Sequence, residues 1–184
     1  MPIVIDTEAD RGLIIREASA ASGVPVHEWA EINPSALTFL PQLLDYCKAN
    51  ACGKYNKSWA CPPACGTVEE NKEKISRYEK ILVFTTKHTL EDPFDHEGMT
   101  KGREQHTSLA IEIRKKLGNV PLYGAGACSV CDTCAFPASC LFPEKMIGSI
   151  EAAGIDVTEL SKTAGIAYNN GPNTVTYFSM LLLN

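Results

Sequence analysis

The order of hydrophobic and polar positions divides the chain into segments with the spacing of helices and strands. Apolar residues at helical spacing predict an amphipathic helix over residues 8–22, with Thr7 as its N-cap and Gly23 at its end. Alternation of apolar and polar residues over 24–32 predicts a half-buried strand. The nearly continuous apolar run of residues 80–86 is typical of a buried central strand.

The rest of the chain continues this mixture of elements. The same patterns predict helices over residues 42–49, 68–78, 97–117, 144–153 and 158–164, and strands over residues 120–123 and 174–183. Because strands and helices alternate, we expect an α/β (or α+β) fold with a small central sheet and flanking helices. A length of 184 residues suits one domain, and we expect residues 1–184 to form it.

Two histidines fall on these elements without neighbouring ligand residues. His27 lies on the polar phase of the predicted strand, so we expect it at the surface. His106 lies on the long helix predicted over residues 97–117, where we expect it to be solvated or capped. Neither histidine is therefore a leading metal-ligand candidate.

The predicted strand at residues 120–123 runs into a glycine-containing loop with four cysteines, Cys128, Cys131, Cys134 and Cys140. Their spacing is C-x2-C-x2-C-x5-C, and a tight triplet of this kind wraps a cubane cluster in ferredoxins, where the last gap is three residues. Open α/β sheets bind ligands in loops that follow the carboxyl ends of strands. The sequence therefore predicts a 4Fe–4S cluster in cysteine group two, residues 126–143, with zinc as the alternative.

Cysteine group one, residues 47–65, is less regular. Its members Cys47, Cys52, Cys61 and Cys65 have the spacing C-x4-C-x8-C-x3-C. Two pairs joined by a short loop can close a tetrahedral zinc site, and the same four thiols can hold a second 4Fe–4S cluster.

The first loop also carries Tyr55, Trp59 and the pair Pro62-Pro63. The prolines stiffen the backbone, and the aromatic side chains are candidates for an apolar lining that limits the access of water to a metal centre. The alternative for Trp59 is that it fills the core beneath an irregular loop.

Composition and charge indicate the cellular compartment of the protein and the classes of partner it has. Hydrophobic residues make up 45% of the chain, which is enough for a core without disulfides. The sequence begins without a basic segment followed by an apolar run, and no apolar run reaches membrane-spanning length. We therefore expect a cytoplasmic protein with reduced thiols and no membrane contact, in which clustered cysteines bind metal. The net charge of −5 argues against a nucleic-acid partner.

Both cysteine groups resemble those of a family of predicted metal-binding proteins (domain of unknown function 2284), known mainly from anaerobic bacteria and archaea. The resemblance is carried by Cys47-x4-Cys52-Gly53-x-Tyr55-x3-Trp59-x-Cys61-Pro62-Pro63, by Gly126-x-Cys128-x2-Cys131-x2-Cys134-x5-Cys140-x2-Pro143, and by Ser149-x-Glu151-Ala152-x-Gly154-Ile155-Asp156-Val157. It extends from about Cys47 to Gly165 and implies metal binding, with iron–sulfur as the expected cofactor. The family pattern covers Cys47, Cys52 and Cys61 more firmly than Cys65.

Three functions are compatible with these features. The first is a cytoplasmic iron–sulfur protein with two 4Fe–4S clusters that exchanges electrons with a redox partner protein. The second is an enzyme, in which a cluster without Cys65 as a ligand leaves one iron open to a small substrate. The third is a non-redox binding module stabilised by zinc. The sequence contains no dinucleotide fingerprint, P-loop or zinc-protease motif, and it indicates no oligomeric state.

Overall fold

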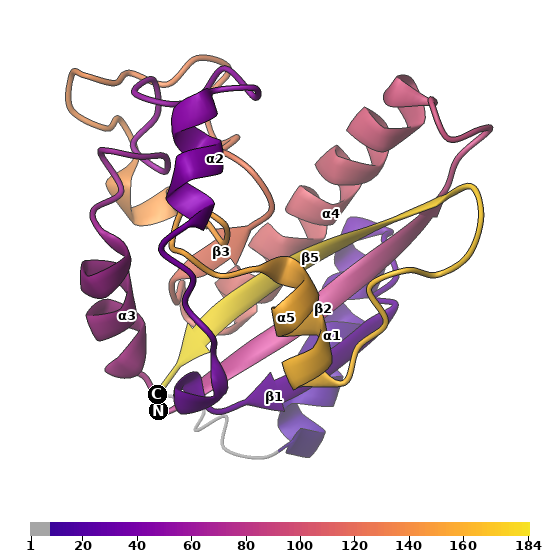
Figure 1. Ribbon diagram of the computed structural model, residues 1–184. Helices are drawn as coiled ribbons and strands as arrows, with labels where there is room; N and C mark the ends of the chain where they lie inside the picture. The colour runs from indigo at the N-terminus through magenta and orange to yellow at the C-terminus, as the bar shows by residue number, and fades with distance from the viewer. Residues whose placement is uncertain (1–7) are drawn as a thin grey trace.

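A mixed five-stranded sheet with the order β1-β2-β5-β3-β4 forms the centre of an α/β fold (Figure 1). The computed structural model describes residues 8–184. The strands are β1 (Glu28–Ile32), β2 (Lys80–Thr89), β3 (Leu122–Gly124), β4 (Ile147–Ser149) and β5 (Thr174–Leu183). All neighbouring strands are antiparallel except β3 and β4, which are parallel.

Helices cover both faces of this sheet. The α-helices in the described residues are α1 (Glu8–Ser22), α2 (Leu43–Ala49), α3 (Val68–Ser76), α4 (His96–Lys116) and α5 (Val157–Ala164), and the short 3-10 helices are η1 (Pro34–Ala36) and η2 (Pro143–Lys145). In Figure 1, α1 and α4 lie behind the sheet and α5 lies in front of it. Helix α3, at the left of the view, packs on the same face as α5. The fold class expected from the alternating elements is confirmed.

Strand β2 shows why the sheet has two apolar faces. Leu82 and Phe84 pack towards α1 and α4, whereas Ile81 and Val83 pack towards α3 and α5. Successive side chains of a strand point to opposite faces, so a continuous apolar run is buried on both sides. The prediction of a central strand is confirmed, and the strand continues to Thr89.

The region predicted as a helix over residues 144–153 is different in the structure. It contains η2, the edge strand β4 and a turn, so this prediction is wrong. Strand β4 pairs with β3, and Gly148 is the cross-strand neighbour of Tyr123. The tyrosine ring covers this glycine so closely that a Cβ atom on Gly148 would be 2.6 Å from the ring. Pairing with the sheet therefore overrides the local helical preference of this segment.

Strand β1 is shorter than the strand predicted over residues 24–32, because it begins at Glu28. Pro25 has no N–H to donate, so this end of the segment is a poor place for a sheet ladder. His27 is hydrogen-bonded through Nε2 to Oδ1 of Asn170 (2.9 Å) at an exposed site, as the surface prediction requires. The predicted N-cap Thr7 lies outside the described residues.

His106 is buried between α4 and the sheet, so the prediction of a solvated or capped histidine is wrong. Only 4% of its surface is exposed. Its Nδ1 is hydrogen-bonded to Thr86 Oγ1 and its Nε2 to Ser179 Oγ, both at 2.8 Å. The two hydroxyl partners come from β2 and β5, far from His106 in sequence. Burial, assisted by the nearby His88, lowers the pKa of His106 to about 3.

His106 should make the fold sensitive to acid. In the unfolded chain its pKa is near the ordinary value of 6.5, so unfolding takes up a proton as the pH falls below that value. The free energy of unfolding should decrease between pH 6.5 and pH 3, by up to about 1.4 kcal/mol per pH unit from this residue. Urea unfolding of His106→Gln at several pH values should give a shallower dependence.

The control for this experiment is His27→Gln, which removes an exposed histidine. It leaves the buried hydrogen bonds of His106 to Thr86 and Ser179 in place, so the pH dependence assigned to His106 should remain. Equal slopes for His106→Gln and the wild-type protein would contradict the assignment of a neutral buried imidazole.

Candidate metal centre

Cysteine group one begins at the carboxyl end of α2 and continues through an irregular loop. Asn50 ends the helix in a left-handed conformation with φ 57°, and its side-chain Oδ1 accepts a hydrogen bond from the Tyr55 N–H at 3.0 Å. At the far end of the loop, the Cys65 N–H donates to the Cys61 carbonyl at 3.1 Å. These local bonds give the loop a defined path without regular secondary structure.

The four thiols of group one interact with one another. All are free, and Cys61 is buried whereas Cys52 is exposed. Burial is the largest cause that raises the pKa of Cys47, and Cys52 raises it further. Burial also raises the pKa of Cys65 to about 11, with a contribution from Cys61. Thiolates that repel one another form a natural ligand set, because a bound cation removes the repulsion.

The four thiols of group two line one hollow. Cys128, Cys131, Cys134 and Cys140 share it with hydrophobic side chains that include Met146. Desolvation and repulsion from the other three thiols raise the pKa of Cys131. The loop of cysteine group two, which follows the carboxyl end of β3, is therefore folded around a space that its four thiols share.

Cys134 shows that group two is completed by residues of group one. Desolvation alone would raise the pKa of Cys134, but hydrogen bonds from the backbone N–H groups of Phe136 and Trp59 and from the Ser58 side chain, with the positive charge of Lys54, lower it. Three of these four residues come from the first loop. The first loop thus stabilises a thiolate of the second group.

Trp59 of the first loop contacts the second loop. Its indole N–H donates to the Ala138 carbonyl at 2.9 Å, and its ring packs edge-to-face on Phe136 with the centroids 5.2 Å apart. In Figure 1 the two loops accordingly lie side by side near α2, although Trp59 and Ala138 are 79 residues apart in the sequence. Trp59 is half-buried and packs on the second loop, where it lines the space beneath the two irregular loops.

Glu151 adds a second connection, from the turn after β4. Its Oε2 accepts hydrogen bonds from the Gly126 N–H at 3.2 Å and from the Ser149 hydroxyl at 3.1 Å. The same carboxylate is close enough to Cys47 to raise its pKa, after burial and Cys52. Glu151 therefore holds the start of the second loop beside the first cysteine of group one.

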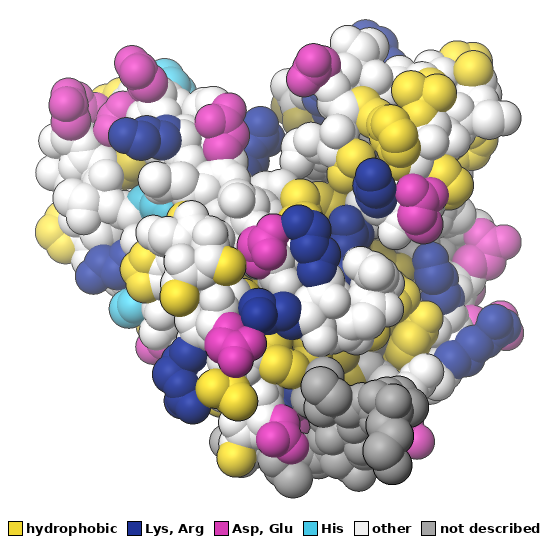
Figure 2. Space-filling model, turned by 180° about the vertical axis from the view of Figure 1, so that it is seen from behind, with side chains coloured by type: hydrophobic (Ala, Val, Ile, Leu, Met, Phe, Trp, Pro, Cys, Tyr) yellow, Lys and Arg dark blue, Asp and Glu magenta, His cyan; other side chains and the backbone are white. Residues whose placement is uncertain are grey.

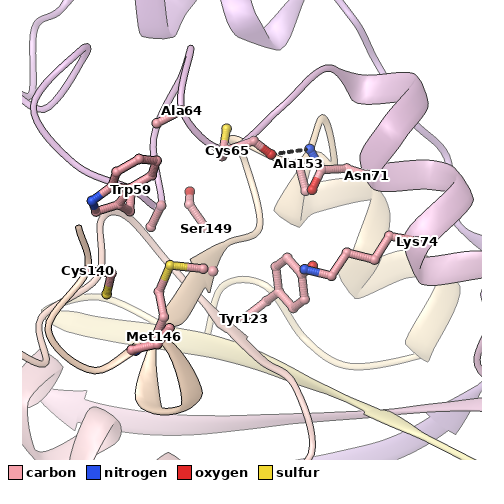
Figure 3. Close-up of a pocket in the computed structure, with 13 residues that line it drawn as sticks. Trp59, Ala64, Cys65, Asn71, Lys74, Tyr123, Cys140, Met146, Ser149 and Ala153 are labelled. Atoms are coloured by element: carbon pink, nitrogen blue, oxygen red, sulfur yellow. Dashed lines mark hydrogen bonds between the residues drawn. The ribbon is translucent and has the colours of Figure 1, made fainter. Parts of the chain in front are cut away.

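A cavity of about 310 Å³ separates the two groups and is lined by one thiol from each, Cys65 and Cys140 (Figure 3). Trp59 and Met146 line the same space. Asn71 of α3 fixes its upper wall, because its Nδ2 donates to the Cys65 carbonyl at 3.0 Å. The cavity is large enough for a small organic molecule, and its lining is mainly apolar with a few polar groups.

The structure gathers all eight cysteines named from the sequence at one end of the sheet, in two neighbouring sets of four. Within residues 8–184, no three His, Cys, Asp or Glu side chains meet at the spacing of ligands around one metal ion. Sequence reasoning missed Ser58 and Lys54, which act on Cys134, and gave Glu151 no role although it lies in a quoted motif. Nothing in the local sequence marks these side chains, because their partners are distant in the chain.

Eight free thiols at one end of a mixed sheet, Cys47 in α2 and the other seven on loops, define a cysteine-rich α/β protein. A family model described as predicted metal-binding protein (DUF2284) matches residues 30–183, and the chain belongs to this family. The match extends beyond the region of the two cysteine groups at both ends. No curated protein and no solved structure matches the chain. In the described part of the chain, none of the helices combines the length and apolar character needed to cross a membrane.

The Trp59 contact predicts a measurable loss of stability. Trp59→Phe keeps an aromatic ring but removes the donor to Ala138, so the free energy of unfolding should fall by about 1 kcal/mol. Trp59→Ala also loses the contact with Phe136 and should cost more, on the order of 2–3 kcal/mol. Urea unfolding of the anaerobically purified protein, followed by circular dichroism, measures both changes.

Tyr55→Phe is the matched control, because it removes a polar group from the same loop. It should change the stability by less than about 0.5 kcal/mol. The bridging role of Trp59 is wrong if Trp59→Phe unfolds at the same urea concentration as Tyr55→Phe.

Proposed function

We propose that this protein is a cytoplasmic iron–sulfur protein that binds two 4Fe–4S clusters and exchanges electrons with a redox partner protein. Cysteine group one, with Cys47, Cys52, Cys61 and Cys65, holds the first cluster, and cysteine group two, with Cys128, Cys131, Cys134 and Cys140, holds the second. Such a cluster, when bound, accepts and releases single electrons. The family description supports metal binding, and the cluster type and the electron transfer are our proposal.

The single observation that supports this proposal best is the common hollow of group two, which its four thiols line together. A cubane takes one thiolate at each of its four irons, so four thiols that face a common space are a suitable ligand set for it. Backbone N–H groups at the hollow also donate towards sulfur, as at Cys134. Hydrogen bonds of this kind stabilise the negative charge of cluster sulfurs.

The protein surface at group two supports the proposed partner. Leu141 and Phe142 directly follow Cys140, and 64% and 40% of their respective surfaces are exposed. Figure 2 shows hydrophobic side chains at the upper right, on the side where the cysteine loops lie. Exposed apolar side chains beside an electron-carrying centre suit a transient protein contact that brings the two centres close.

Metal analysis tests the proposal directly. The anaerobically purified protein should be brown, contain about eight irons and eight sulfides per chain, and bleach in air or with dithionite, since two clusters contain four of each. A colourless protein that carries two zinc ions would instead establish the zinc-stabilised module.

A pair of variants in one loop assigns the iron to the thiols. Cys131→Ser removes the middle ligand of the triplet and should lose the iron of the second cluster. Ser129→Ala, two residues away, removes a hydroxyl but no thiol and should retain all the iron. Equal iron contents in the two variants would exclude Cys131 as a ligand.

The cavity between the groups favours a second candidate function, an enzyme with an incompletely ligated first cluster. Cys65 lines this cavity, and its raised pKa favours the protonated thiol in the absence of metal. If Cys65 stays protonated and unbound, an iron held by the other three thiols has a vacant position for a small substrate. Lys74 and Tyr123 line the same cavity and would contact such a molecule.

Added ligands distinguish the two candidate functions. If Cys65 closes the first cluster, cyanide or imidazole should leave the electron paramagnetic resonance spectrum of the reduced protein unchanged. A new spectrum that reverts on washing would establish an open iron and favour the enzyme. Cys65→Ala, which creates the vacancy deliberately, provides the positive control.

A further inference from the structure

Arg114, in the last turn of α4, is a buried cation near cysteine group two. Only 5% of its surface is exposed, and no carboxylate in residues 8–184 forms an ion pair with it. Burying a charge is costly unless it is compensated, so an arginine at such a site has a specific partner. Its hydrogen bonds identify that partner.

The guanidinium binds the backbone that leads into β4. Nη1 of Arg114 donates to the Lys145 carbonyl at 3.0 Å and to the Met146 carbonyl at 3.3 Å. The next amide, the N–H of Ile147, donates to the sulfur of Cys128 at 3.4 Å. The carbonyl of Met146 and the N–H of Ile147 belong to the same peptide group.

A single planar peptide therefore connects the cation to the sulfur. In a trans peptide the C=O and N–H bonds point in opposite directions. Arg114 holds the carbonyl on one side, so the N–H is directed to Cys128 on the other. The positive charge also polarises the peptide and makes its N–H a stronger donor. Burial lowers the pKa of Arg114, and the nearby Cys128 thiol opposes that effect.

We propose that Arg114 is a positioning residue that sets the reduction potential of the centre in cysteine group two, by orienting and polarising the Met146–Ile147 peptide whose N–H donates to Cys128. This inference rests on the proposed function, because it requires a redox-active cluster at group two. Hydrogen bonds to sulfur and positive charge nearby both favour the reduced, more negative cluster and raise its potential.

The experiment compares three variants by redox titration of the anaerobic protein, monitored by electron paramagnetic resonance. Arg114→Gln removes the charge and should shift the potential of the second cluster to a more negative value. Arg114→Lys keeps the charge but replaces the fixed planar donor by a flexible ammonium, so its shift should have the same sign and be smaller. Amide hydrogen exchange at Ile147 should be faster in both variants, which reports the peptide contact without reference to the metal.

Lys145→Gln is the matched control, since it removes one positive charge from the residue beside this peptide. Its ammonium lies over the Phe142 ring, 5.1 Å from the centroid, on an exposed side chain, where water screens its charge. The reduction potential of the second cluster in Lys145→Gln should remain close to that in the wild-type protein.

The possible outcomes separate this inference from the proposed function. A wild-type protein without an iron–sulfur signal overturns the proposed function and the redox role of Arg114 together. A wild-type signal whose potential shifts equally in Arg114→Gln and Lys145→Gln, or in neither, overturns the role of Arg114 alone. If Arg114→Gln loses its iron, Arg114→Lys is the variant that tests the inference. A wild-type reduction potential in Arg114→Lys, together with wild-type amide exchange at Ile147, overturns the inference.

Discussion

The contact between the two cysteine loops is the interaction on which the candidate metal centre depends. Neither loop has a regular hydrogen-bonding pattern, so contact with the other loop adds to the few local bonds that define its path. Trp59 contributes to that contact through its bond to Ala138 and its packing on Phe136. Glu151, in the turn after β4, connects the loops indirectly, because it binds the N–H of Gly126 and lies close to Cys47. The two groups are therefore parts of one site, and a change in one loop alters the surroundings of the thiols in the other.

Electrostatics explains how a protein can hold so many thiols together. Burial and mutual repulsion raise the pKa of most of the thiols whose pKa is shifted, so collecting them as thiolates without a cation would be unfavourable. The protein provides compensation at particular sulfurs. Cys134 receives backbone N–H donors and the charge of Lys54, and Cys128 receives the N–H of Ile147. Ser58 and Lys54 also lower the pKa of Cys61 in group one, so the same two side chains act on both groups.

The sheet gives these loops a rigid support. Strand β3 ends at Gly124 between β5 and β4, and the second loop starts there. Strand β4 returns beside it, which brings Ile147 to Cys128 and Glu151 to Gly126. Below this edge, the buried hydrogen bonds of His106 to Thr86 and Ser179 join α4 to the two central strands. The helix that carries Arg114 is thereby fixed relative to the strands that carry the cysteine loop.

The sequence alone determined the fold class, most of the elements and the identity of the eight candidate ligands. The apolar run of β2 and the spacing of Cys128, Cys131 and Cys134 are local patterns, and local patterns are readable because neighbouring residues share one element. Tertiary structure decided the rest. It made residues 147–149 a strand, since β3 offers pairing there, and it buried His106, since hydroxyl groups from two distant strands satisfy its ring. It also brought Trp59 to Ala138 and Arg114 to the peptide behind Cys128. Such contacts join residues far apart in the chain, and no local pattern encodes which distant partner a side chain will meet.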